Sequence, residues 1–212
     1  MKHLLSIRDL SLSEIYDIFD LAKKLKDDNK HGRKHHLLQG KVLGMIFAKS
    51  STRTRVSFET GMYQLGGYAI FLSSQDIQLG RGETIGDTAK VLSRYIDGIM
   101  IRTFKQSDVE DLARYGTIPV INGLTDLLHP CQILADLFTV LEVKGGLKGL
   151  KLAYIGDGNN VANSLLYGCS KVGMDLSIAS PEGYDCNIEI AEYAMNEAKN
   201  TGAKIVLTRD PV

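Results

Sequence analysis

The feature that most constrains this chain is the alternation of short apolar runs with longer segments of helical periodicity. The runs typical of buried strands cover 42–48, 68–72, 98–101, 118–121, 152–155, 176–179 and 205–207. Between most of them, apolar residues recur at helical spacing over 53–65, 84–95, 107–115, 133–143, 161–172 and 188–200. This alternation predicts parallel sheets with helices on both faces and binding sites in the loops that follow the strands.

A further helix is predicted ahead of the first strand, over 11–28. Its apolar residues share one helical face, and Ser11 with Glu14 has the pattern of a capping box. The basic tract KHGRKHH at 30–36 follows it. Such a tract can hold a metal or a polyanion, but a solvated loop is the commoner structure, and we assign it no function.

Three glycines between 145 and 149 predict a domain boundary, because they follow a helix and precede a new strand. We expect one domain over 1–144, a linker over 145–150 and the first part of a second domain over 151–212. That last stretch is short for a self-contained doubly wound domain. The predicted fold class is therefore α/β, with two doubly wound parallel-sheet domains of which the second is incomplete in this chain.

Composition excludes several classes of function. The 25 Lys and Arg residues balance 25 Asp and Glu residues, so the basic surplus that nucleic acids and anionic membranes attract is missing. The longest apolar run is far shorter than a membrane helix, and the first residues lack the pattern of a secretion signal. Three widely spaced cysteines, Cys131, Cys169 and Cys186, argue against a disulfide framework or a zinc cluster. We expect a cytoplasmic protein.

The strongest site signal is the run KSSTRTR at 49–55, where the first strand of the sheet ends and a helix begins. Free backbone N–H groups and the helix dipole make such a junction an anion site, and hydroxyl and guanidinium groups suit phosphate. The spacing differs from that of a nucleotide P-loop. The alternative is a helix cap with solvated arginines.

A second signal is HPCQ at 129–132, after a strand and directly before an apolar helix. Pro130 suits the first turn of that helix, which leaves His129 and Gln132 at its N-terminus. A histidine there can donate to a carbonyl oxygen or exchange protons near neutral pH, and an amide can bind a small polar group. Arg102, at the end of a strand, is expected in the same crevice. Taken alone, His129 is more often a capping residue.

The third signal is GDGNN at 156–160, at the first strand-to-helix turn after the predicted linker. It begins like a dinucleotide fingerprint, but Val161 stands where the third glycine belongs. Asn159 and Asn160 can bind a carboxylate or an amine, or serve as plain helix caps. The long polar loop over 73–83 suits a mobile segment or one that contacts a partner.

Four segments, SSTRTRVSFETGMYQLGG, QLGRGETIGDTAKVLSRYIDGIMIR, HPCQILADL and GDGNNVANSL, resemble the ornithine carbamoyltransferases in order along the whole chain. Aspartate carbamoyltransferases share the STRTR and HPxQ motifs. They lack the GDGNN turn and usually carry Lys where this chain has Gly82. The resemblance therefore favours ornithine over aspartate as the amine substrate.

The resemblance implies a carbamoyl transferase with no metal or organic cofactor, assembled as a homotrimer or a multiple of trimers. The residues it assigns to carbamoyl phosphate are Ser51, Thr52, Arg53, Thr54, Arg102, His129 and Gln132. It implies that Gln78 reaches into a neighbouring subunit's site and that Asn160 holds the amino-acid end of ornithine. Thr54, Arg102 and His129 are the expected catalytic residues.

Family members continue beyond the position of Val212 through DSMG-type and HCLP-type loops that complete the ornithine side. The resemblance thus implies that ornithine turnover depends on those segments. Within the family, a carbamoyltransferase for aspartate or another amine stays open. Two other classes also stay open on the sequence: a dinucleotide-dependent oxidoreductase that uses GDGNN, and a non-catalytic module or truncated fragment that binds carbamoyl phosphate.

Overall fold

The computed structural model describes residues 2–74, 77 and 82–211. The chain forms two compact units, each described here by itself. The first comprises Met1–Leu5 and Ile18–Thr125, and the second comprises Ser6–Asp17 and Asp126–Val212. These units follow contacts in space, so the domain boundaries predicted at 145–150 stay a prediction.

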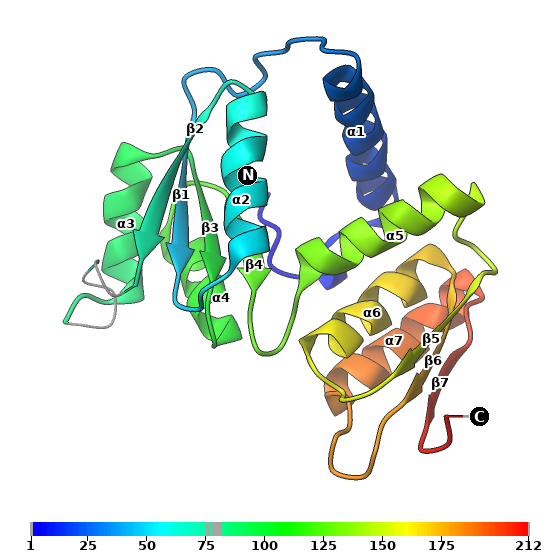
Figure 1. Cartoon of the computed structure of the whole chain (residues 1–212). Helices are drawn as coiled ribbons and strands as arrows, with labels where there is room; N and C mark the ends of the chain where they lie inside the picture. Colours follow the sequence, from blue (N-terminus) through cyan, green and yellow to red (C-terminus); the bar gives the residue numbers. More distant parts are fainter. Residues whose placement is uncertain (1, 75–76, 78–81, 212) are drawn as a thin grey trace. The chain divides into compact units, whose positions relative to one another are not determined.

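The first unit is built on a parallel sheet of four strands in the order β2-β1-β3-β4 (Figure 1). The strands are β1 (Val42–Phe47), β2 (Tyr68–Ser73), β3 (Gly98–Arg102) and β4 (Val120–Leu124). The chain moves outward from β1 to β2 and then crosses back to β3 and β4. The direction of winding therefore reverses between β1 and β3, and a crevice outside the carboxyl ends of such a strand pair is the usual ligand site of this architecture.

Both faces of this sheet carry helices. They are α2 (Thr52–Gln64), α3 (Ile85–Tyr95) and α4 (Gln106–Tyr115), preceded in the chain by α1 (Leu12–Lys30). Helices α3 and α4 pack together on one face, and α2 covers the other (Figure 1).

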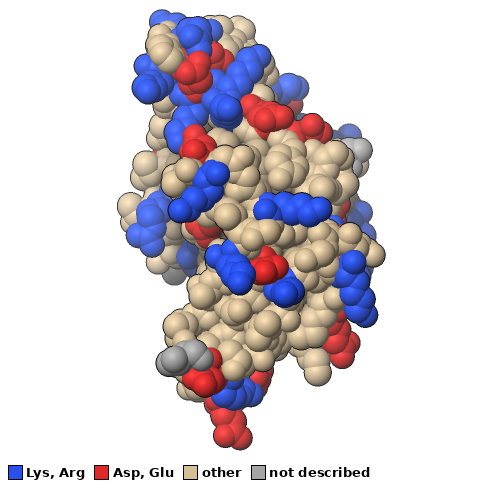
Figure 2. Space-filling view, turned by 90° about the vertical axis from the view of Figure 1, so that its right-hand side faces the viewer, with Lys and Arg blue, Asp and Glu red and all other residues tan. Residues whose placement is uncertain are grey.

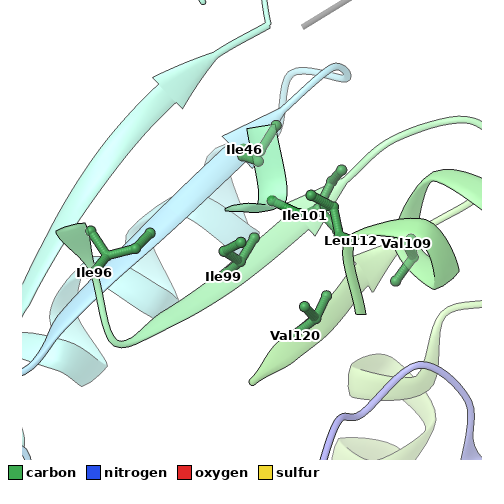
Figure 3. Close-up of a cluster of buried hydrophobic side chains, with 8 residues drawn as sticks. Ile46, Ile96, Ile99, Ile101, Val109, Leu112 and Val120 are labelled. Atoms are coloured by element: carbon green, nitrogen blue, oxygen red, sulfur yellow. The ribbon is translucent and has the colours of Figure 1, made fainter. Parts of the chain in front are cut away.

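Side chains of β1 point alternately to the two faces of the sheet, so the core of the first unit has one part on each face. Ile46 packs with Ile99, Ile101 and Leu112 in a cluster that β1, β3 and β4 share with α3 and α4 (Figure 3). Met45 and its alternate neighbours Leu43 and Phe47 pack on the other face with Met62 of α2. Successive side chains of a strand point to opposite faces, so one short strand supplies both cores.

The second unit begins with the 3-10 helix η1 (Ile7–Asp9) and contains a parallel sheet of three strands in the order β5-β6-β7. Its elements are α5 (Pro130–Lys144), β5 (Lys151–Ile155), α6 (Asn160–Val172), β6 (Asp175–Ala179), α7 (Ile188–Thr201) and β7 (Ile205–Thr208). The three strands are added in one direction, so α6 and α7 lie side by side on the same face (Figure 1).

The predicted alternation of strand and helix is confirmed, and the boundaries differ where local chemistry intervenes. Strand β4 begins at Val120 rather than at 118, directly after Pro119, which has no N–H to donate to a strand ladder. Helix α5 begins at Pro130, ahead of the apolar periodicity that starts at 133, and this confirms the predicted place of Pro130 in its first turn.

The capping box ahead of α1 is confirmed: the Ser11 N–H donates to Glu14 Oε2 at 2.8 Å, and the Glu14 N–H donates to Ser11 Oγ at 3.2 Å. Among the helices that the structure describes, none combines the length and the apolar character that crossing a membrane requires.

Candidate functional site

The junction of β1 and α2 has the geometry of an anion site. Ser51 is the N-cap of α2, with extended backbone at φ −162° and ψ 121°, and its Oγ accepts the N–H of Thr54 at 3.2 Å. Thr52, Arg53 and Thr54 form the first helical turn, which contains no acidic residue. The positive end of the helix dipole and the free N–H groups there are thus not neutralised from within that turn.

Arg102 ends β3 beside this junction. Burial lowers the pKa of its guanidinium, and the nearby positive charge of Arg53 lowers it further. Its Nε is buried, with no hydrogen-bond partner among the described residues. The Ala48 N–H donates to the Arg102 carbonyl oxygen at 2.8 Å and ties the end of β1 to the end of β3. Two like charges held close together favour an anion between them.

A bulge in the neighbouring strand lies next to Arg102. Ile101 pairs with Asn122, but Arg102 pairs with Leu124, so Gly123 is the extra residue of β4. Bulges of this kind re-aim side chains at the ends of strands.

The two arginines of the STRTR run have different surroundings. The Arg55 Nε donates to Glu59 Oε1 at 2.9 Å, and its guanidinium lies 3.8 Å from the centre of the Phe71 ring. Arg55 is therefore engaged by its own helix and by β2. Arg53 is exposed at the first turn and lies near Arg102. This difference separates the predicted ligand residue from its neighbour two positions along.

In the second unit, His129 and Gln132 lie at the N-terminus of α5. His129 is the N-cap, with φ −138° and ψ 67°, and its side chain makes no capping hydrogen bond, unlike the capping alternative. The Gln132 Nε2 donates to Asp136 Oδ1 at 2.9 Å. This bond directs the amide nitrogen along the helix and leaves the amide oxygen as an acceptor.

Two residues of α6 that the sequence analysis did not identify hold the His129 segment. The His129 N–H donates to Ser164 Oγ at 2.8 Å, and the Asn163 Nδ2 donates to the Leu127 carbonyl oxygen at 3.2 Å. Both side chains are buried in a helix whose other buried residues are mostly apolar. A pair of polar residues at core positions was the signal that could have found them.

In the GDGNN turn, Asn159 caps a helix and Gly158 lies against another segment of the backbone. Asn159 is the N-cap of α6, and its Oδ1 accepts the N–H groups of Val161 and Ala162, so the capping alternative holds for Asn159. Asn160 is the first helical residue. A Cβ on Gly158 would lie 2.3 Å from backbone atoms of Asp185 and Cys186. Contact with the protein's own backbone explains this glycine without a dinucleotide.

Gln78 lies outside the described residues.

The basic tract after α1 forms a loop in which Arg33 pairs with Asp27 and with Asp28, the latter at 2.7 Å. The loop lines a cavity of about 720 Å³ together with Gly61 and residues 63–67. This cavity lies where chain segments enter β1 and β2, at the end of the sheet opposite the STRTR junction. On the face drawn in Figure 2, acidic and basic side chains lie interspersed.

The comparisons with known proteins agree with these motifs. Residues 2–142 match the carbamoyl-P binding domain of the aspartate/ornithine carbamoyltransferases, and residues 148–212 match their Asp/Orn binding domain. An ornithine carbamoyltransferase from Caldicellulosiruptor saccharolyticus is 56% identical over 211 residues, covering 100% of this chain and 68% of the relative. One from Oceanobacillus iheyensis is 61% identical over 206 residues, covering 97% and 64%.

Structure gives the same result. The ornithine carbamoyltransferase from Pyrococcus furiosus superposes with a TM-score of 0.97 at 52% identity, covering 99% of this chain and 67% of that one. The chain thus spans about two thirds of the length of its relatives. By sequence and by fold, the chain belongs to the aspartate/ornithine carbamoyltransferase family.

Proposed function

We propose that this protein transfers the carbamoyl group of carbamoyl phosphate to the δ-amine of ornithine, giving citrulline and phosphate. The observation that carries the proposal is the β1–α2 junction, where an N-terminal helical turn free of acidic residues meets the close pair Arg53 and Arg102. This junction suits a dianionic phosphate group. The names of the relatives supply ornithine as the acceptor.

The reaction is an acyl transfer. The amine nitrogen attacks the carbonyl carbon, a tetrahedral intermediate forms, and the bond from carbon to the phosphate oxygen breaks. The amine proton passes to the departing phosphate, which would otherwise leave as a trianion. The intermediate carries negative charge on the former carbonyl oxygen, and the departing phosphate carries more. The protein must stabilise both charges, and fixed donors aimed at them lower the barrier.

The residues divide between these tasks. Ser51, Thr52 and Arg53, with the N–H groups of the first turn of α2, bind the phosphate. Thr54, Arg102 and His129 stabilise the oxyanion.

Gln132 orients the carbamoyl NH2 group: its own amide nitrogen is engaged by Asp136, so its oxygen accepts from the substrate. Asn160 binds the amino-acid end of ornithine.

The assembly and setting are part of the same proposal. The family resemblance supports a homotrimer or a multiple of trimers, with Gln78 reaching the site of a neighbouring subunit. It also supports a cytoplasmic enzyme of arginine metabolism. The domain boundaries that we propose are 1–144, 145–150 and 151–212.

Two measurements test the function. Calorimetry should detect carbamoyl phosphate binding without ornithine, since the phosphate residues precede the predicted linker. Colorimetric assay of the protein with both substrates should then detect citrulline, with aspartate in place of ornithine as the control. Absence of carbamoyl phosphate binding by folded protein would refute the proposal, and carbamoylation of aspartate at the same rate would refute ornithine selectivity.

A further inference from the structure

We infer that Ser164 of α6 is a positioning residue that fixes the ring of His129. The inference rests on the proposed function for its effect on the ligand, but its structural content concerns the second unit alone. Ser164 lies 35 residues after His129 in the chain and contacts its backbone rather than its ring.

The contact is short and buried. The His129 N–H donates to Ser164 Oγ at 2.8 Å, and Ser164 is 1% exposed. One residue earlier in the helix, Asn163 is 4% exposed and donates from Nδ2 to the Leu127 carbonyl oxygen at 3.2 Å. Two consecutive residues of α6 therefore hold both ends of the segment Leu127, Leu128 and His129. Away from water, such bonds are not exchanged for solvent.

The backbone of His129 is restrained from its other side as well. Proline disfavours helical dihedral angles for the residue before it, and His129, which precedes Pro130, has φ −138° and ψ 67°. The proline restrains the carbonyl side of His129, and Ser164 restrains its N–H. Because side-chain rotamers depend on φ and ψ, fixing both limits the directions that the imidazole can take.

Asn163, which holds one end of this segment, is itself held by another element. The Asn163 Oδ1 accepts the Asn187 N–H at 3.0 Å, and the Asn187 Oδ1 accepts the Ile190 N–H as the N-cap of α7. The Asn163 amide thus joins the His129 segment to the start of a second helix. A support that connects three elements moves less than a lone side chain on a loop.

A second buried serine of α6 shows the ordinary behaviour of this residue type. Ser170 is 0% exposed, and its Oγ donates to the Tyr167 carbonyl oxygen at 3.1 Å within the same helix. Serine in a helix commonly makes this local bond. Ser164 instead accepts a hydrogen bond from a distant segment. Ser170 therefore provides a matched control with the same residue type, helix and burial.

The arrangement also assigns two tasks to one helix. Asn160, the proposed ligand of the amino-acid end, and Ser164 are four residues apart, so they lie on the same face of α6. One turn of α6 carries a proposed substrate residue directly and supports another through its backbone.

The first test needs no ligand. The ring resonance of His129 in a 1H–13C spectrum is assigned from its loss in His129→Ala. We expect that resonance to shift or broaden in Ser164→Ala and to remain in place in Ser170→Ala. An unshifted resonance in Ser164→Ala would overturn the inference whether or not the protein binds carbamoyl phosphate.

The second test is a double-mutant cycle read by calorimetry with carbamoyl phosphate. Ser164→Ala should weaken binding by about three- to tenfold, the range of one lost hydrogen bond, and Ser170→Ala should leave it unchanged. If Ser164 acts through His129, the further loss from Ser164→Ala should vanish in the His129→Ala background. Additive losses would overturn the inference.

Ser164→Cys serves if the alanine variant does not fold. It fills the position with a somewhat larger side chain of the same shape but offers a much weaker acceptor. We expect at least a twofold loss of carbamoyl phosphate affinity together with a shifted His129 resonance. Wild-type affinity and an unchanged resonance in this variant would contradict the inference.

Discussion

Arg102, the last residue of β3, has a pKa lowered first by burial and then by the positive charge of Arg53, which stands in the first turn of α2. The two guanidinium groups therefore lie near enough for their charges to interact. Helix α2 follows β1, and Arg102 belongs to β3. These are the two strands between which the winding of the first sheet reverses. Topology thus brings together two positive charges that lie far apart in the sequence.

Replacing Arg53 with Ala should reduce carbamoyl phosphate affinity at least tenfold. A hydrogen bond to a charged group contributes about 1.5–3 kcal/mol, and each 1.4 kcal/mol is a factor of ten. Arg53→Lys should restore only part of the affinity, because an ammonium group cannot make a two-pronged contact.

The matched control for Arg53 is Arg55→Ala, since Arg55 is engaged by Glu59 and Phe71. It should bind carbamoyl phosphate within about twofold of wild type, less than the effect of one ordinary hydrogen bond. Equal losses in the two variants, measured by calorimetry, would mean that the run acts as a helix cap and not as a ligand site.

Gly158→Ala should destabilise the second unit, because its Cβ would lie 2.3 Å from backbone atoms that cannot rotate away. Overpacking of this kind costs about 1–3 kcal/mol or more. Gly146→Ala is the control, since nothing lies within 4 Å of its Cβ. We expect Gly158→Ala to unfold at a lower urea concentration than Gly146→Ala. Equal unfolding midpoints would show that the backbone at 185–186 moves aside to make room for the added Cβ.

The carboxylate of Asp97 should make stability depend on pH in the acid range. A hydrogen bond from Lys41 and another from the Val42 N–H lower the pKa of Asp97 below its usual value. The Asp97 carboxylate therefore binds a proton more readily in the unfolded chain than in the folded protein. The contribution of Asp97 is present above the unfolded pKa near 3.8 and is lost as the pH falls through the folded value.

Thermal unfolding of wild type and Asp97→Asn tests this dependence. The difference in melting temperature should be larger at pH 6 than at pH 3. A difference that stays constant or grows on acidification would contradict the assignment.

Cys169 should resist thiol reagents until the protein unfolds. It is 0% exposed, and burial raises the pKa of its thiol to about 12, so the reactive thiolate is scarce at pH 8. Cys186 is partly exposed and should react first. Peptide mass mapping after native labelling distinguishes the two, and early modification of Cys169 would show local opening of α6.

Much of this fold is readable from the sequence because each strand is a short apolar run bounded by a helix of clear periodicity. The end of β4 was not readable. The run at 118–121 predicts a strand that begins before Pro119, and the structure places the strand beyond it, through Gly123 to Leu124. Pairing with β3 decides this boundary, and pairing partners are not encoded in a local pattern.

The candidate site, too, could be predicted only in part from the sequence. The STRTR and HPCQ motifs are local, so their places at strand ends and helix starts follow from the sequence alone. Ser164 carries no such motif: its place among apolar residues marks it as unusual, but a serine inside an apolar helix usually bonds to its own helix, as Ser170 does. Only the fold shows that one of the two serines accepts from a segment 35 residues away.

The bulge at Gly123 makes the length of β4 matter as well as its composition. Deleting that one residue would leave Asn122 and Leu124 as consecutive partners of Ile101 and Arg102, so the pairing would become regular and the bulge beside Arg102 would be lost. Leu124 is 8% exposed at this point, and the backbone beside it would have to shift to close the gap. The number of residues between Val120 and Leu124, as well as their types, therefore fixes the shape of the strand end beside Arg102.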